Sequence, residues 1–178
     1  MSLLSGFQEK NRNFIELLHN IPFYLYIVKC LLGTIICHTL YKLFPDHQLY
    51  WSIVSVLLVL APDPVDSMKL SFARMKANIA GASIGLLYFL CPFPPLLSLC
   101  LAVLTTILVC WYFVLGNASR SALAALIIVF IQENEAGNWS IALERMGSVI
   151  IGCLVALILT MLFHYAGKIL SRRKETSP

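Results

Sequence analysis

Long apolar stretches separated by short polar segments make up most of this 178-residue chain. The longest uncharged stretch runs from Ala77 to Ser119 and includes no Asp, Glu, Lys or Arg. A membrane-spanning helix needs about 20 apolar residues, so this stretch is long enough for two helices joined by a proline-rich turn at residues 91–95. The pattern along the whole chain predicts six membrane-spanning helices, over residues 22–44, 49–61, 77–90, 95–115, 121–131 and 145–165.

A pattern that opens with an Arg-Met pair occurs twice, once in each half of the chain. In each copy, small residues stand three, seven and eleven positions after the arginine, and the spacing of four places them on one helix face, where another backbone can approach. The two sets are Arg74 with Ala77, Gly81 and Gly85, and Arg145 with Ser148, Gly152 and Ala156. We therefore predict two copies of one three-helix unit, residues 22–94 and 95–167. Because each copy has an odd number of spans, the copies lie in opposite orientations, as in transporters whose binding site lies near the bilayer midplane.

Basic residues are concentrated in alternate connections between the predicted helices. They precede the first helix and follow the second, fourth and sixth, at Lys10, Arg12, Lys69, Arg74, Lys76, Arg120, Lys168, Arg172, Arg173 and Lys174. The positive-inside rule then places both termini in the cytoplasm, with an amphipathic segment at 1–21 and a basic tail at 168–178. It also puts Arg74 at the cytoplasmic end of its helix and Arg145 at the outer end. The segment 1–20 is polar and does not form a cleavable leader, so we expect a multi-pass protein of the cell inner membrane.

The composition supports this fold class, an all-α integral membrane protein. Hydrophobic residues make up 59% of the chain and charged residues only 12%, whereas soluble domains carry about 25% charged residues. The net charge of +4 is clustered at the ends, which indicates topology and does not indicate nucleic-acid binding. The six cysteines form no CxxC pair, so neither a disulfide nor a metal site is expected. We find no nucleotide-binding loop or nucleophile triad, and we predict neither a cofactor nor an enzymatic activity.

Basic residues near the helices are the first candidates for a binding site. Arginine holds a carboxylate through two parallel hydrogen bonds, so Arg74 and Arg145 are the strongest candidates for an anion site, with Lys76 beside the first. The alternative is that each arginine anchors the membrane interface by reaching the lipid headgroups. Lys29 lies inside the first predicted helix, where it attracts anions or pairs with Asp63, or extends to the cytoplasmic face.

Acidic and aromatic residues provide further candidates. Asp63 and Asp66 follow the short second helix, and a carboxyl at membrane depth can exchange protons or form a gate with Arg74. Alternatively, Asp66 caps the next helix and Asp63 faces cytoplasmic water. Glu144, in an outer acidic patch with Glu133 and Glu135, could pair with a neighbouring arginine. Trp51 is explained first by the aromatic belt at the membrane interface, and second by stacking on a substrate.

A family resemblance rests on these same positions. Trp51 near the start of the second helix, the apolar run that ends in Pro62, Arg74 with its following glycines, and Arg145 with Gly152 resemble the membrane domain of the fusaric acid resistance (FUSC-like) and aromatic acid exporter family. A more distant similarity is to plant aluminium-activated malate transporters. The resemblance covers roughly residues 22–167. It implies a six-helix membrane unit that works in pairs and exports aromatic or other small organic acids, often with proton coupling.

Two features depart from that family's pattern. Many members have a large cytoplasmic domain or a second membrane half. We expect neither here, and therefore expect a homodimer in membrane lipid. Ala77 stands where a glycine is common. The predicted function is export of small organic anions, with Arg74, Lys29 and Arg145 attracting the carboxylate and Asp63 exchanging a proton. The alternatives are a passive anion channel and a non-transporting membrane subunit.

Overall fold

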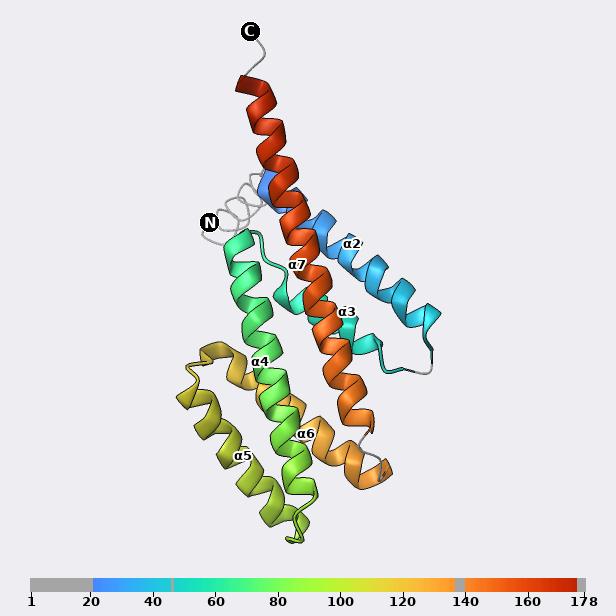
Figure 1. Cartoon of the computed structure of the whole chain (residues 1–178), viewed down its shortest axis with the longest axis vertical. Helices are drawn as coiled ribbons and strands as arrows, with labels where there is room; N and C mark the ends of the chain where they lie inside the picture. Colours follow the sequence, from blue (N-terminus) through green and yellow to red (C-terminus); the bar gives the residue numbers. More distant parts are fainter. Residues whose placement is uncertain (1–20, 46, 137–139, 176–178) are drawn as a thin grey trace, which may run out of the picture.

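The computed structural model describes residues 21–45, 47–136 and 140–175, and this part of the chain is helical, with short connections and no strand (Figure 1). The elements are α2 (Ile21–Leu43), α3 (Tyr50–Val59), α4 (Pro64–Phe89), α5 (Pro95–Tyr112), the 3₁₀ turn η1 (Gly116–Ala118), α6 (Ser119–Ala136) and α7 (Ser140–Glu175). The prediction of an all-helical fold is therefore confirmed for the described residues. The amphipathic segment predicted at 1–21 lies almost wholly outside them.

The largest difference from the predicted helices concerns α4. The apolar pattern predicts a start at residue 77, but the helix begins at Pro64 and includes the polar segment that follows. Proline is favoured at the first helical position, and no glycine or proline interrupts residues 65–76, so the helix continues through the charged residues. α7 likewise extends beyond its apolar part, and its 36 residues span about 54 Å.

Three of the described helices are long and apolar enough to cross a membrane. These segments are Phe23–Leu43, Pro95–Tyr112 and Ala142–Lys168. The apolar helices Tyr50–Val59 and Ser119–Ile131 are shorter than a membrane span, and α4 is less apolar along its charged first half. The prediction of six membrane-spanning helices therefore stays a prediction.

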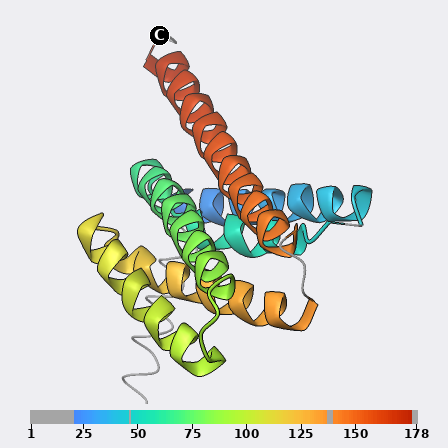
Figure 2. The ribbon, with the colours of Figure 1, turned by 60° about the horizontal axis from the view of Figure 1, so that its bottom comes forward.

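The helices pack in pairs that correspond between the two halves of the chain (Figures 1 and 2). α4 lies on α6 as α7 lies on α3, and α5 lies beside α6 as α2 lies beside α3. α4 and α7 also contact each other. Each of the two helices that contain the Arg-Met pattern therefore packs on a helix of the other half of the chain, while the repeat itself stays a prediction.

Two glycines allow the closest of these helix contacts. A methyl group at Gly81 would overlap the carbonyl oxygen of Ala122 on α6, and one at Gly152 would overlap the carbonyl oxygen of Ser52 on α3. Each glycine stands seven positions after the arginine of its unit, so both contacts occur at equivalent positions of the repeat. All six of the small residues singled out by the sequence are buried: Ala77, Gly81, Gly85, Ser148, Gly152 and Ala156.

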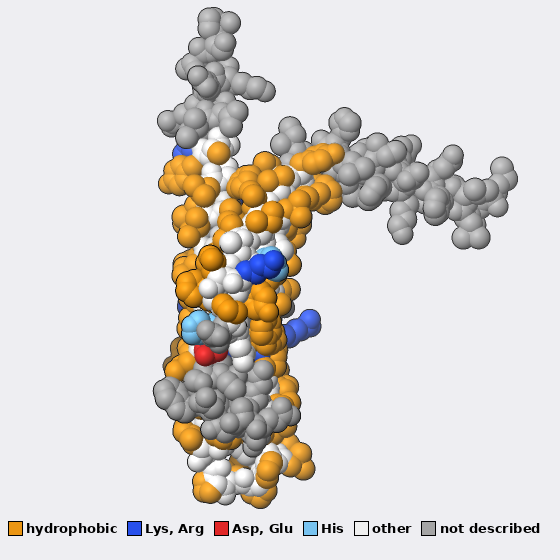
Figure 3. All heavy atoms as spheres, turned by 90° about the vertical axis from the view of Figure 1, so that its right-hand side faces the viewer, with side chains coloured by type: hydrophobic (Ala, Val, Ile, Leu, Met, Phe, Trp, Pro, Cys, Tyr) orange, Lys and Arg blue, Asp and Glu red, His pale blue; other side chains and the backbone are white. Residues whose placement is uncertain are grey.

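The outer surface is predominantly apolar on the face shown in Figure 3. Large apolar side chains such as Leu31, Leu96 and Leu162 are more than half exposed, whereas much of the interior consists of small residues. Helices in lipid pack through close backbone approach rather than through a large apolar core, because lipid tails are as apolar as the side chains. This distribution is that of a membrane-embedded protein.

Candidate functional site

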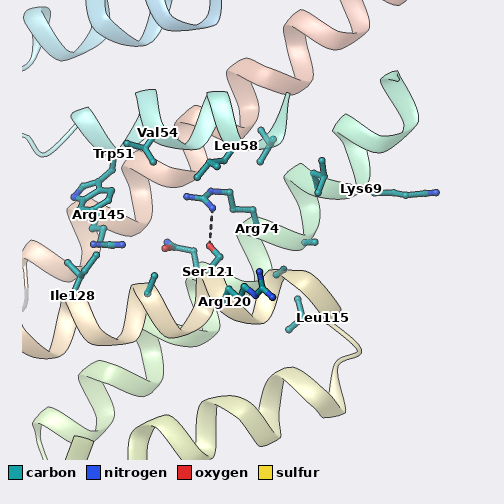
Figure 4. Close-up of a pocket in the computed structure, with 16 residues that line it drawn as sticks. Trp51, Val54, Leu58, Lys69, Arg74, Leu115, Arg120, Ser121, Ile128 and Arg145 are labelled. Carbon is teal, nitrogen blue, oxygen red and sulfur yellow. Dashed lines mark hydrogen bonds between the residues drawn. The ribbon is translucent and has the colours of Figure 1, made fainter. Parts of the chain in front are cut away.

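A cavity of about 560 Å³ lies between α3, α4, α7 and the start of α6 (Figure 4). Much of its wall is apolar, and its polar side chains are four cations and two neutral groups: Lys69, Arg74, Arg120, Arg145, Asn78 and Ser121. None of the described residues that line it is acidic. The cavity is therefore an electropositive space with apolar walls.

Arg145 is the most buried cation of this cavity. It lies in the second turn of α7 and is only 4% exposed, and its guanidinium carbon lies 3.9 Å from the centre of the Trp51 ring on α3. This cation–π contact orients the guanidinium, but its Nε and Nη1 have no hydrogen-bond partner among the described residues. Burying a charge without a counter-charge costs several kcal/mol, so a bound anion would relieve this arrangement.

Arg74 approaches the cavity from α4 on the other side (Figure 4). Its Nη1 donates to the hydroxyl of Ser121 at 3.2 Å, whereas its Nε is buried without a partner. Asn78 lies one turn further along the same helix, and its buried amide nitrogen also lacks a partner among the described residues. Together with Arg145, these groups place several unsatisfied donors around one space.

The two arginines and the side chains they contact occupy equivalent positions of the repeat. When the two halves of the sequence are aligned so that Arg74 matches Arg145, Trp51 aligns to within one position of Ser121. Each arginine comes from the third helix of its unit and contacts the second helix of the other unit. The cavity thus lies between the two predicted units.

The remaining basic candidates lie elsewhere. Lys76 is exposed on α4 and does not line this cavity. Lys29 is buried on α2, but it lines a different cavity with Pro62 and Pro64. Of the predicted site residues, only the two arginines line this cavity. Lys29 interacts electrostatically with Asp63, as one of its predicted roles requires, but the two form no ion pair within 4 Å.

Asp63, rather than Asp66, caps α4. Its Oδ1 accepts a hydrogen bond from the backbone N–H of Val65 at 2.9 Å. The predicted cap at Asp66 is wrong, because Pro64 takes the first helical position and leaves Asp66 within the first turn. Both carboxylates are exposed and line none of the cavities described.

The suggested ion pairs with the arginines do not form. Among the described side chains, the ion pair within 4 Å joins His47 to Glu144 at 3.7 Å, so Glu144 does not neutralise Arg145. The side chains of Glu133 and Glu135 lie outside the described residues.

The chain matches the model of the fusaric acid resistance protein-like family over residues 33–159. It belongs to this family. The matched range contains both arginines, all of α3 to α6, the second half of α2 and the first half of α7, and the family resemblance predicted from the sequence is confirmed. No curated protein and no solved structure matches the chain. The family and the apolar helices together identify a membrane-embedded protein of a transport or resistance type.

The sequence contained signals for parts of this family member's cavity that the predicted site did not include. Asn78 stands four residues after Arg74, which places both on one face of a helix. Ser121 corresponds to Trp51 in the repeat, to within one position. Lys69 and Arg120 line the cavity, although their positions in the sequence indicate only the membrane topology.

Proposed function

We propose that this fusaric acid resistance-like protein exports small organic anions, which bind in the cavity between Arg74 and Arg145. The proposal rests on one observation: both arginines line a cavity that no described acidic residue lines. Their unpartnered nitrogens are donors that a carboxylate would satisfy. The charge and the empty donor positions both favour an anion over a neutral or cationic molecule.

The apolar part of the wall indicates what the anion carries. Trp51, Val54 and Leu58 of α3 and Ile128 of α6 line the cavity, and its volume of about 560 Å³ is in the range of small-molecule sites. A carboxylate with a planar apolar body would place its charge at the arginines and its body against these side chains. We therefore propose aromatic carboxylates as the substrate class.

Membrane topology and coupling complete the proposal. The two units cross the inner membrane in opposite orientations, with both termini in the cytoplasm, and expose the cavity alternately to each side. Asp63 is the candidate for proton exchange. Because its carboxylate caps α4 outside the cavity, it would act on the movement of α4 rather than on the substrate. Pairing with a second copy, which the family resemblance implies, can be tested by the mass of the purified protein in a lipid nanodisc.

The decisive experiment is uptake of labelled 4-hydroxybenzoate into proteoliposomes, with and without a pH gradient. Accumulation driven by the gradient supports the coupled exporter, whereas flux that only equilibrates indicates a passive channel. Absence of flux from folded protein across several aromatic and aliphatic acids would indicate a non-transporting subunit.

Variants connect the flux to the cavity. Arg74→Gln and Arg145→Gln should each lower kcat/KM at least about tenfold, because a hydrogen bond to a charged group contributes about 1.5–3 kcal/mol. Lys76→Gln is the matched control, since it removes a cation from α4 that does not line the cavity. Wild-type transport by both arginine variants would remove this cavity from the transport path.

A further inference from the structure

A second basic site lies at the end of the molecule where α4 starts and α7 leaves the bundle. Two adjacent cavities, of about 480 and 280 Å³, share Pro64, His164 and Lys168 in their walls. The first also contains Lys29. Figure 1 shows the first half of α2, the start of α4 and the last third of α7 together at this end.

Lys29 is placed unusually for a lysine. Its side chain is only 4% exposed, yet it forms no ion pair within 4 Å with a described carboxylate. Neither cavity is lined by a described Asp or Glu. Asp63 acts on this ammonium electrostatically but forms no direct ion pair with it within 4 Å. A buried ammonium without a direct ion pair attracts an anion, and His164 and Lys168 line the same cavity beside it.

Thr160 supplies an independent indication of a ligand. Its side chain is 1% exposed and lines the smaller cavity, and its hydroxyl has no hydrogen-bond partner among the described residues. The helical threonines Thr34, Thr39, Thr105 and Thr106 instead donate to the carbonyl four residues earlier. The hydroxyl of Thr160 is therefore available to donate to a group in the cavity, at a position where most buried hydroxyls are satisfied.

The surroundings of the cavities indicate a lipid rather than a soluble ion. Their walls include Leu25, Val65, Met161 and Tyr165, which are 42–64% exposed on the outer surface. Lys168 is also the last residue of the apolar segment of α7, whereas Lys29 lies in the first third of the apolar segment of α2, so the basic groups lie toward one end of both segments. Basic pockets between helices at this depth suit anionic headgroups.

We infer that these two cavities hold the phosphate headgroup of an anionic phospholipid. Lys29, His164 and Lys168 surround the phosphate, the hydroxyl of Thr160 donates to it, and the acyl chains lie along the exposed apolar side chains. The site is separate from the arginine cavity and does not depend on transport.

The test measures lipid binding to the full chain purified in detergent. Dioleoylphosphatidylglycerol, dioleoylphosphatidylcholine and inorganic phosphate are each titrated, and thermal unfolding and native mass spectrometry report binding. We expect phosphatidylglycerol to bind at least about tenfold more tightly than phosphatidylcholine. Phosphate alone at millimolar concentration should not raise the unfolding temperature. Equal binding of the two lipids would overturn the inference, and stabilisation by phosphate alone would show a soluble-anion site instead.

Two variants locate the binding, and each has a matched control. Lys29→Gln and Thr160→Val should weaken phosphatidylglycerol binding at least about fivefold. Lys42→Gln, at the exposed end of the same helix, and Thr34→Val should leave it within about twofold of the wild type. If both site variants bind the lipid as the wild type does, the inference is wrong.

Thr160→Val also separates a binding role from a structural role. Valine has nearly the same shape as threonine and removes an unpartnered buried hydroxyl, so the lipid-free protein should unfold at the same or a higher temperature than the wild type. Lipid affinity should fall in the same variant. A parallel loss of stability and affinity would show that the hydroxyl supports the fold and would contradict its role as a headgroup donor.

Discussion

Replacing Gly81 by alanine should force α4 and α6 apart. The added methyl group would overlap the carbonyl oxygen of Ala122 and lie 2.9 Å from its Cα, whereas carbon atoms in contact are about 3.5–4.0 Å apart. The helices must therefore separate by roughly 1 Å, because the opposing atoms belong to backbone and cannot rotate away. The same reasoning applies to Gly152, where the methyl group would overlap Ser52 on α3.

The size of the effect follows from two opposing contributions. Overpacking of this kind costs about 3 kcal/mol at the upper end of its usual range, and the better helix propensity of alanine returns up to about 1 kcal/mol. The net loss of about 2 kcal/mol should lower the unfolding temperature by about 4–8 °C in a chain of this size. Gly81→Ala and Gly152→Ala should show similar losses, since their contacts are equivalent in the repeat.

Gly147 provides the matched control. It lies on α7, the same helix as Gly152, and a methyl group there would meet nothing within 4 Å. Gly147→Ala should therefore leave the unfolding temperature unchanged or raise it by a few degrees, because alanine favours the helix. Thermal unfolding of the three variants in one detergent measures this difference. If Gly81→Ala and Gly152→Ala are as stable as Gly147→Ala, the helices do not approach as closely as described.

Two further predictions concern the cavity and the start of α4. Trp51→Leu should raise the KM for 4-hydroxybenzoate about fivefold without unfolding the protein, because it removes the ring that orients Arg145. Trp111→Leu, on the exposed end of α5, is the control and should leave KM unchanged. Equal KM values for the two variants would contradict the role of the Trp51 ring. Asp63→Ala should lower the free energy of unfolding by about 1 kcal/mol through loss of the helix cap, and Asp66→Ala should lower it by less. Chemical denaturation in detergent measures both losses. A larger loss in Asp66→Ala would show that Asp66, and not Asp63, caps α4.

Local sequence signals predicted where the helices lie, but α4, α6 and α7 extend beyond their predicted bounds. Apolar length and proline position are properties of the chain itself, and α2, α3 and α5 begin and end within three residues of the predicted bounds. The hydropathy pattern predicts a connection at the polar residues 65–76, because hydropathy reflects charge and does not report the backbone conformation. Nothing in that segment disfavours a helix, so it joined α4.

The candidate site was predicted only in part, because charge alone does not specify which cations meet. Arg74 and Arg145 line one cavity, but Lys29 lies against the start of α4 and Lys76 faces outward. Lys29 lies inside an apolar helix, and from the sequence such a lysine is a candidate for a binding site. Which cavity it lines depends on how α2 packs beside α3 and α7, and that contact is not encoded in local spacing.

By itself, the sequence determined that the chain is helical, apolar and a member of the fusaric acid resistance-like family, and it contains one arginine-and-small-residue pattern twice. Length, hydropathy and spacing are enough for these conclusions, because each depends on residues close together in the chain or on a repeated order. Only the tertiary structure decided that Arg145 lies on Trp51, that Arg74 reaches Ser121, and that all four meet at one cavity. These contacts join residues that lie far apart in the chain and belong to different units of the repeat. They form because glycines at equivalent places let α4 and α7 approach the helices of the opposite unit.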